Sequence, residues 1–431
     1  MRPTSPSSTR RSFSSGTPSA AARSGSTACP TRSPSRTTPT SPARPTTRTW
    51  SAPSSTEPGS VGQPVCRTIR QTGCAAFRRG LWCHAGVVQR SVDWLLAARS
   101  QANCLARPVD EAGPGGVADV VRRTGGLQAQ TWRGAAYAVR ARSTATTLAD
   151  VTRAQETDRS VVRGWFMRGT LHLVATEHAG PLLGLLGPKL IKGTERRYGE
   201  LGLTPAIRAA AADLIEEHLL ANGPTGRSAL AGVLVTAGLI AESKGQQVYA
   251  LIRHTGLLGR LCYGPGHDKD ETWVAVRDWL GKPLDLEADV EGVARRYLAA
   301  YGPATARDLA TWSGLSVPAA RTGLRAVATR SFDVEGVEFS AVEDLPGARE
   351  LRLLGEFDPY LLGYDDRRHA LPDEHRRHIH PGGGMVRPAV AIGGRVIGSW
   401  KHADLSYDLF GRTGEPAGLA AELEDVARFA G

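Results

Sequence analysis

Hydrophobic residues recur at helical spacing in three stretches between residues 92 and 345, and each stretch predicts the same order of elements. The third stretch is the clearest, because Val293 and Tyr297 share one helical face. A short helix over residues 306–312 and a longer one over 317–328 are expected to follow. The order helix, short helix, tight turn, helix is typical of a helix-turn-helix.

The helix ends in this third stretch carry residues with known capping preferences. Thr305 precedes the short helix and is expected to be its N-cap. Gly314 lies in the turn, where it can adopt a left-handed backbone. Arg321 and Arg325 fall on the outward face of the last helix, which is the face that reads DNA in helix-turn-helix proteins.

The second stretch repeats the order nearer the N-terminus. Residues 223–226 form a Gly-Pro break, and helices are expected over 227–236 and 246–254. Alternating segments at 258–263 and 272–276 flank a Gly-Pro-Gly break and predict a β-hairpin wing.

The first stretch is less regular. Its three helices are expected over residues 90–105, 115–123 and 131–142, with an additional helix over 148–158. Residues 170–174 alternate like a strand and would supply its wing. A packing unit of three helices without DNA-binding function is the alternative for each stretch, but three copies in series favour a tandem array.

The pattern changes after residue 346. Strands are expected over 351–354 and 360–364, and residues 388–392 and 395–400 flank a Gly-Gly pair that predicts a β-hairpin. A helix over 416–429 closes the chain. These elements predict a small β-rich domain.

The predicted fold is therefore mostly α-helical with small β parts, built from three tandem winged helix-turn-helix domains and a C-terminal β-rich domain. The expected divisions are an N-terminal extension over 1–90, winged helices over 91–180, 181–285 and 286–345, and the C-terminal domain over 346–431.

The N-terminal extension has no hydrophobic period. Residues 1–60 are mostly Ser, Thr, Pro, Arg and Ala and hold 10 of the 27 prolines, so we expect this segment to be disordered. A start codon assigned too far upstream would account for it equally well. Cys29, Cys66, Cys74 and Cys83 are not spaced like metal ligands, and we predict no metal and no cofactor.

Composition narrows the function classes. The formal net charge is +11, yet the first 100 residues hold 14 Arg against two acidic residues, and the rest of the chain is nearly neutral. A general argument from basic charge to nucleic-acid binding therefore fails, and local clusters must carry it. The chain has no long apolar run, which argues against a membrane span, and it is too poor in cysteine for a disulfide scaffold.

One polar motif stands out, because Gln128 and Gln130 follow the pair Gly125-Gly126. In an extended segment, residues two apart point the same way. Two amides facing one side could act on a ligand together. The alternative is a pair of polar turn residues that cap backbone groups.

Several strings of the chain together resemble the winged helix proteins of the AlkZ/YcaQ type, which are bacterial DNA glycosylases that remove alkylated purines and unhook interstrand crosslinks. This resemblance implies that Gln128 and Gln130 are catalytic and that three winged helices surround a DNA channel. Glutamine at position 130 favours the AlkZ-like branch. The strings that carry the resemblance are residues 126–130, 162–174, 301–305, 312–315 and 354–358.

The chemistry suits an amide pair. An alkylated purine already carries positive charge, so it departs as a neutral base without a general acid. An amide carbonyl can orient a water toward the sugar and stabilise its developing positive charge. No Lys lies near the motif in sequence, because Lys189 is the first in the chain. We therefore predict hydrolysis without a lyase step, unless folding brings Lys189 or Lys192 close.

Basic residues near aromatic side chains, and a basic cluster over residues 367–380, are the predicted DNA contacts. The alternatives are an amphipathic segment with Trp165 in the core and a solvated loop. His172 alternates with apolar neighbours and is expected to face the channel. The predicted contacts are Arg163, Arg168, His172, Arg321, Arg325, Arg367, Arg368, Arg376 and Arg377.

The leading hypothesis is a monofunctional DNA glycosylase that hydrolyses the N-glycosidic bond of cationic N-alkylpurines and unhooks interstrand crosslinks, in repair or in resistance to a self-made genotoxin. It would act as a monomer on double-stranded DNA with alkylated or crosslinked purines, without a membrane, in the cytoplasm at the nucleoid. The alternatives are a winged-helix transcriptional regulator without enzymatic activity and a family member that binds DNA but has lost catalysis.

Overall fold

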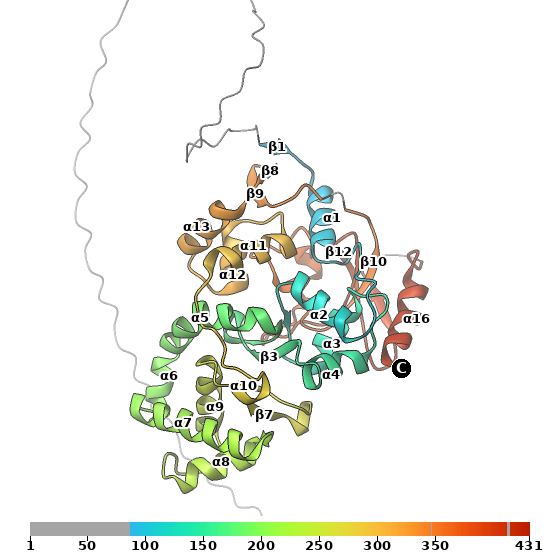
Figure 1. Cartoon of the computed structure of the whole chain (residues 1–431). Coiled ribbons are helices and arrows are strands. Elements are labelled where there is room, and N and C mark those ends of the chain that lie inside the picture. Colours follow the sequence, from blue (N-terminus) through green and yellow to red (C-terminus); the bar gives the residue numbers. More distant parts are fainter. Residues whose placement is uncertain (1–86, 346, 412–413) are drawn as a thin grey trace, which may run out of the picture. The chain divides into compact units, whose positions relative to one another are not determined.

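The computed structural model describes residues 87–345, 347–411 and 414–431, which are mostly helical with small sheets (Figure 1). The predicted disorder of residues 1–86 and the four cysteines lie outside the described residues. Residues 87–90, the last of the predicted extension, include the short strand Val88–Gln89, so the prediction is wrong for them. Within the described ranges, no helix combines the length and apolar character that a membrane span requires. No group of three or more His, Cys, Asp or Glu side chains gathers there as a metal site.

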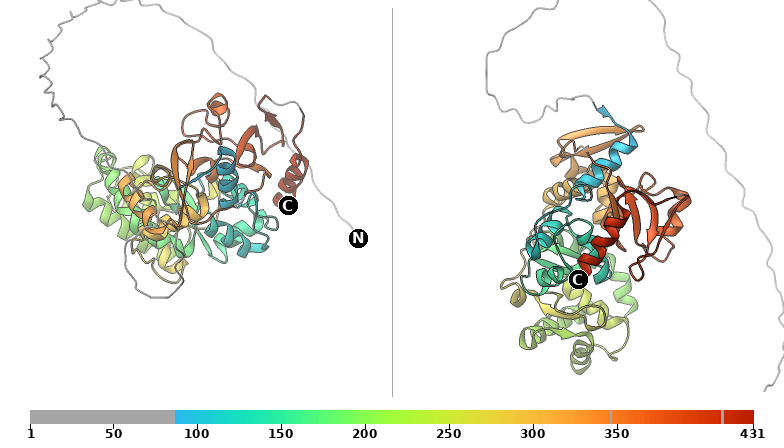
Figure 2. Two further views of the ribbon diagram at one scale, coloured as in Figure 1. Left: turned by 90° about the horizontal axis from the view of Figure 1, so that it is seen from above. Right: turned by 90° about the vertical axis from the view of Figure 1, so that its right-hand side faces the viewer.

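Three helix–hairpin units share one element order: a helix, a short strand or bridge, two more helices and a β-hairpin. We name them the first unit (residues 113–175), the second unit (205–275) and the third unit (290–341). In each unit the short strand or bridge pairs with a strand of the hairpin. In Figures 1 and 2 the second and third units lie at opposite ends of this part of the chain, with the first between them.

The first unit begins one helix later than the sequence predicts. The helix expected over 90–105 packs on a helix of the third unit instead, and the helix expected as an addition over 148–158 is the last of the unit. Helical periodicity identifies a buried face but not the element that covers it. The elements are α2 (Gly113–Arg123), β2 (Leu127–Gln128), α3 (Trp132–Arg140), α4 (Leu148–Glu156), β3 (Val161–Trp165) and β4 (Leu171–Ala175), and the sheet order is β2-β4-β3.

The second unit follows the prediction, including its hairpin. Thr204 caps its first helix, and a Gly-Pro break separates that helix from the next. The elements are α7 (Pro205–Asn222), β5 (Thr225–Gly226), α8 (Arg227–Thr236), α9 (Gln246–Leu257), β6 (Leu261–Tyr263) and β7 (Thr272–Ala275).

The third unit confirms both predicted caps. The Thr305 side chain accepts a hydrogen bond from the Asp308 backbone and Asp308 returns one, forming a capping box, and Gly314 has φ 85°. A hairpin that the sequence did not reveal completes the unit and pairs with a strand ahead of the first unit. The elements are α11 (Val290–Tyr301), α12 (Ala306–Ser313), α13 (Val317–Val327), β8 (Arg330–Val334) and β9 (Val337–Ala341), with β1 (Val88–Gln89) parallel to β8 and α1 (Val92–Ala102) packed on α11.

Connecting helices join the units. The longest, α5, runs from the first unit's hairpin toward the second unit and packs on α9 and β4. One hydrophobic core passes through α5 and through residues of all three units. The connecting elements are α5 (Thr176–Gly193), α6 (Glu195–Glu200) and α10 (Val276–Trp279).

The C-terminal part is a four-stranded sheet closed by a helix. The predicted hairpin around Gly393-Gly394 is present, but the strand expected over 360–364 is wrong. Asp358 accepts a hydrogen bond from Tyr360 N and Pro359 occupies the first helical position, so a helical turn forms there. The elements are β10 (Leu351–Leu354), α14 (Pro359–Leu362), α15 (Arg376–Ile379), β11 (Ala389–Ile392), β12 (Arg395–Trp400), β13 (Tyr407–Leu409) and α16 (Leu419–Ala430).

Candidate active site

A turn made by two glycines directly precedes the segment that carries the two glutamines. Gly125 and Gly126 both have positive φ, 68° and 120°, and a Cβ on Gly126 would lie 3.0 Å from side-chain atoms of Met167 and Val174. Glycine is therefore required for both conformation and space. The turn delivers Gln128 to the edge of the first unit's sheet.

The side chains of Gln128 and Gln130 are not equally accessible. Ala129 between them is fully buried in the first unit's core, which turns both glutamines away from that core. Gln130 is exposed, whereas Gln128 is 8% exposed. The motif thus offers one open amide and one held inside the protein.

Arg168 holds the Gln128 amide. Its Nη2 donates to Gln128 Oε1 at 2.9 Å, and its Nη1 donates to the backbone oxygen of Trp312 at 2.5 Å. Arg168 has φ 57° and ψ 8°, a left-handed conformation that costs a non-glycine residue about 1 kcal/mol. Burial lowers its guanidinium pKa from the usual value. The sequence predicts Arg168 as a DNA contact. In the structure this half-buried side chain forms its hydrogen bonds with protein groups.

Arg163 holds the backbone between the two glutamines. Its Nε and Nη2 donate to Ala129 O at 3.3 and 3.2 Å, and its Nη1 pairs with Glu271 at 2.8 Å. The guanidinium also lies over the Tyr263 ring. At 2% exposure, Arg163 presents no free guanidinium to phosphate, which corrects the predicted DNA contact. An arginine on a strand cannot be assigned to core or surface from sequence alone.

The loop of the second unit's hairpin covers one side of this segment. Trp132, the first residue of α3, stacks on His267 with ring centroids 3.8 Å apart. His267 Nε2 lies 3.3 Å from Glu156, and Glu156 also accepts a hydrogen bond from Gly266 N. Together with the Arg163–Glu271 pair, these contacts join the second unit to the first beside the glutamines.

His172 lies opposite Gln128 in the sheet register. Its ring is 2% exposed, and burial, followed by the nearby Arg168 charge, lowers its pKa to about 3. Nδ1 lies 2.9 Å from Thr170 O, a pure acceptor, so Nδ1 carries the proton. A neutral, buried imidazole does not fit the predicted role as a phosphate contact in an open channel.

Glu356 and Asp358 of the C-terminal part hold the two ends of α3. Thr131, the N-cap of α3, donates to Glu356 Oε1 at 2.5 Å. Arg142, just beyond the helix, makes two hydrogen bonds of 2.9 and 2.8 Å to Asp358. Both members of that pair have fully buried side chains. The helix that follows the glutamines is therefore fixed at both ends.

Sequence reasoning missed these supporting residues. The string 354–358 carries the resemblance, but the sequence assigns no role to its acids. The one available signal is Thr131, which has the chemistry of an N-cap and is the first residue of the helix predicted over 131–142. Nothing in the sequence pairs Thr131 with a residue 225 positions away.

The remaining predicted DNA contacts lie outside the glutamine segment. Arg321 and Arg325 are exposed on α13, as expected, and Arg376 and Arg377 are exposed on α15. Arg368 is exposed but paired with Asp366 at 2.7 Å. The contacts of these side chains with DNA stay predictions.

Arg367 is half-buried, and its Nε donates to Tyr364 O. Burial and then the neighbouring Arg376 charge lower the pKa of Arg367. The same two arginines, after burial, lower the pKa of His380 to about 4. Like charges held this close would be stabilised by a bound anion such as a phosphate.

Folding brings Lys189 toward the site. From α5, its Nζ donates to the carbonyl of Gly314, and an added Cβ on Gly314 would lie 3.5 Å from the Arg168 backbone. The amine that lies far from the motif in the sequence is therefore separated from Gln128 by two residues, Gly314 and Arg168.

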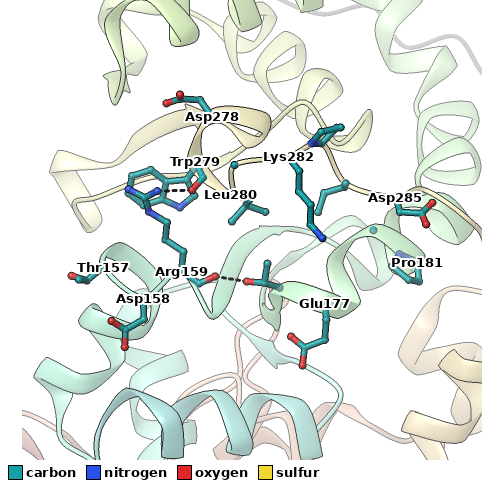
Figure 3. A pocket seen from close by; sticks show the side chains of 15 residues that line it. Thr157, Asp158, Arg159, Glu177, Pro181, Asp278, Trp279, Leu280, Lys282 and Asp285 are labelled. Atoms are coloured by element: carbon teal, nitrogen blue, oxygen red, sulfur yellow. Dashed lines mark hydrogen bonds between the residues drawn. The ribbon is translucent and has the colours of Figure 1, made fainter.

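A cavity of about 770 Å³ opens elsewhere, between the α4–β3 turn, α5 and residues 278–285 (Figure 3). Arg159 donates to Trp279 O at 2.7 Å, and its own carbonyl accepts from Thr176. Acidic and basic side chains mix around the cavity, and none of the predicted site residues lines it. Because this mixed lining does not favour a ligand of one charge, we place the candidate site at the two glutamines.

Comparisons with known proteins identify the family of this chain. A family model described as "DNA glycosylase AlkZ-like" matches residues 121–429. The interstrand DNA cross-link repair glycosylase of Streptomyces sahachiroi is 32% identical over 314 residues, which cover 66% of this chain and 82% of that protein. The solved structure of the Streptomyces sahachiroi DNA glycosylase AlkZ is similar with a TM-score of 0.66 at 28% identity, covering 79% of this chain and 97% of that chain.

The fold and these matches define a DNA-binding enzyme of the DNA glycosylase class. More particularly, the chain belongs to the AlkZ-like DNA glycosylase family. The family model begins within α2 and thus includes the whole glutamine segment. The resemblance drawn from the sequence is confirmed.

Proposed function

We propose that this chain hydrolyses the N-glycosidic bond of cationic N-alkylpurines and unhooks interstrand crosslinks, with Gln128 and Gln130 as its catalytic residues. The observation that carries the proposal is an amide pair at the edge of the first unit's sheet, with the buried Gln128 held by Arg168 and Gln130 exposed. The Streptomyces sahachiroi relative, named for interstrand cross-link repair, supports the choice of substrate.

The chemistry follows from charge. A cationic purine needs no proton to leave, so catalysis reduces to stabilising a positively charged sugar and placing a water about 3–3.5 Å from its anomeric carbon. Dipoles and positioning of this kind contribute roughly tenfold to a thousandfold each. Neutral bases lack that leaving-group charge, and we expect uracil in DNA to persist.

We further propose that the three helix–hairpin units are winged helices, with boundaries near 91–180, 181–285 and 286–345, that surround a DNA channel. Their element order supports this assignment. Arg321, Arg325, Arg376 and Arg377 are exposed and would contact phosphates. The protein would act as a monomer in the cytoplasm at the nucleoid. The family assignment favours this enzyme over a transcriptional regulator.

The test uses the full chain and DNA that carries N7-methylguanine or a nitrogen-mustard crosslink. Alkali should reveal strand breaks at the lesion, and Gln128→Ala and Gln130→Ala should each slow their formation at least tenfold. Gln89→Ala is the matched control, since Gln89 lies in a two-residue strand as Gln128 does and is exposed as Gln130 is, but belongs to β1. Wild-type rates in both site variants would reject the catalytic assignment.

The absence of a lyase step is tested separately. Borohydride added during the reaction traps a Schiff base as a covalent protein–DNA adduct. We expect no adduct with the wild-type chain. An adduct that disappears in Lys189→Arg would overturn hydrolysis alone and identify Lys189 as the nucleophile, consistent with its position beside Gly314.

A further inference from the structure

The Arg168 contact fixes the direction of the Gln128 amide. A guanidinium carries only hydrogen-bond donors, and Arg168 Nη2 lies 2.9 Å from the Gln128 side chain. Only the amide oxygen can accept that bond, so the oxygen must face Arg168. The NH₂ end of the amide consequently points the opposite way.

That NH₂ group is available to a ligand. Among the residues that the structure describes, no group accepts a hydrogen bond from Gln128 Nε2. Among the described residues, Gln128 Nε2 is also not one of the side-chain atoms that are buried without a hydrogen-bond partner. Gln128 is 8% exposed, and its free nitrogen therefore belongs to the part that meets solvent.

Arg168 is itself held firmly enough to impose this direction. Its other terminal nitrogen donates to the Trp312 backbone oxygen, and Gly314 packs against its backbone. The guanidinium is thus anchored in the turn between α12 and α13 of the third unit. A charge behind the amide oxygen also polarises the amide and strengthens its N–H groups as donors.

We propose that Arg168 is a positioning residue of the glycosylase reaction, which locks the Gln128 amide with its NH₂ group toward DNA. Gln128 then donates to an oxygen of the sugar–phosphate backbone beside the lesion, and Gln130 is left to accept a hydrogen bond from the attacking water. This inference rests on the proposed catalytic role of the two glutamines and divides that role between them. A flipped Gln128 would instead turn its oxygen toward a phosphate oxygen, which repels it.

The test is a double-mutant cycle of Arg168→Gln and Gln128→Ala, measured as single-turnover excision of N7-methylguanine. Arg168→Gln should slow excision about tenfold or more in the wild-type background. It should change the rate less than about twofold in the Gln128→Ala background, because Arg168 acts through that amide. The dissociation constant for DNA should stay within about threefold, since Arg168 makes no phosphate contact.

The matched control is Arg159→Gln. Arg159 also has a left-handed backbone, φ 54°, and also donates to a tryptophan carbonyl oxygen, but it lies away from the glutamines. It should excise at the wild-type rate. In Arg168→Ala, added guanidinium ion should restore part of the rate, and it should restore nothing in Arg168→Ala/Gln128→Ala.

Two outcomes separate the inference from the function beneath it. An equal loss from Arg168→Gln with and without Gln128 would overturn the positioning role and leave the glutamines catalytic. A wild-type rate in Gln128→Ala would remove the catalytic role proposed for Gln128, on which the inference rests. If folding alone explained the loss, guanidinium ion would fail to rescue Arg168→Ala, and the inference would be wrong.

Discussion

Single residues at this site differ in ways that their spacing conceals. Gln128 and Gln130 share a face, as the two-residue spacing predicts, yet one is nearly buried and the other is open. They also differ in partner, because Gln128 accepts a hydrogen bond from Arg168, which lies 40 positions away in the sequence. The sequence identifies the pair but cannot distinguish its members, since that distinction depends on a partner brought in by the fold.

At this scale His172 gives a pH prediction. Its pKa of about 3 lies below the usual value of 6.5, so the ring is neutral at every pH above about 4. We expect the single-turnover rate to show no step from His172 between pH 5.5 and 8.5. A step near pH 6.5 in wild type that vanishes in His172→Gln would show that the imidazole titrates during the reaction.

At the scale of helices and turns, features that depend on local chemistry could be predicted and features that depend on packing could not. The capping box at Thr305 and the left-handed Gly314 could be predicted because both depend on local chemistry. The partner of α1 could not, because an apolar face looks the same whichever helix covers it. The helical turn at residues 359–362 differs from the predicted strand for a related reason: the run of Tyr and Leu over 360–364 favours a strand, and the cap at Asp358 overrides that preference.

The glycine turn before β2 gives a prediction about an element. Gly126→Ala adds a Cβ 3.0 Å from two neighbouring side chains at φ 120°. We expect it to lower the unfolding free energy by about 1–3 kcal/mol and to slow excision by displacing Gln128. Gly232→Ala is the control, since Gly232 lies on exposed α8 with nothing nearby, and it should stabilise slightly. Denaturant titration with equal stability for both variants would contradict this.

The buried ion pair between Arg142 and Asp358, just beyond α3, gives a second prediction about an element. Asp358→Asn leaves the Arg142 guanidinium without its charged partner in a site where both side chains are fully buried. We expect a loss of about 3–5 kcal/mol in unfolding free energy. Asp366→Asn breaks the exposed pair with Arg368 and should cost about 1 kcal/mol or less. Losses of similar size in chemical denaturation would argue against the supporting role of Asp358.

At the scale of the whole molecule, the arginines of the described residues differ in how freely their charge is exposed. The described part of the chain is close to neutral, and its arginines are often consumed by ion pairs, as in Arg140 with Glu422 and Asp425. Arg376 and Arg377 are exposed on α15, in a region where like charges already gather. Arginine count alone therefore says little about the DNA interface.

Salt dependence tests this distribution. Each phosphate contact steepens the fall of log K with log salt by about 0.9. Arg376→Ala with Arg377→Ala should flatten that slope by about 1.8 if both side chains contact phosphate. Arg123→Ala is the control, because Arg123 is exposed on α2 but paired with Asp119, and it should leave the slope unchanged. An unaltered slope in the double variant would exclude the α15 cluster from the interface.

The ion pairs between the C-terminal part and residues 140–142 determine when folding can be completed during synthesis. Arg140 and Arg142 follow the glutamines by about a dozen positions, yet their carboxylate partners stand at 358, 422 and 425. A nascent chain that has emerged only as far as the third unit would hold these two guanidiniums without their carboxylate partners. The helix that follows the two glutamines therefore gains its charged partners only after the C-terminal part has been synthesised, and a chain that ends before residue 358 would lack all of them.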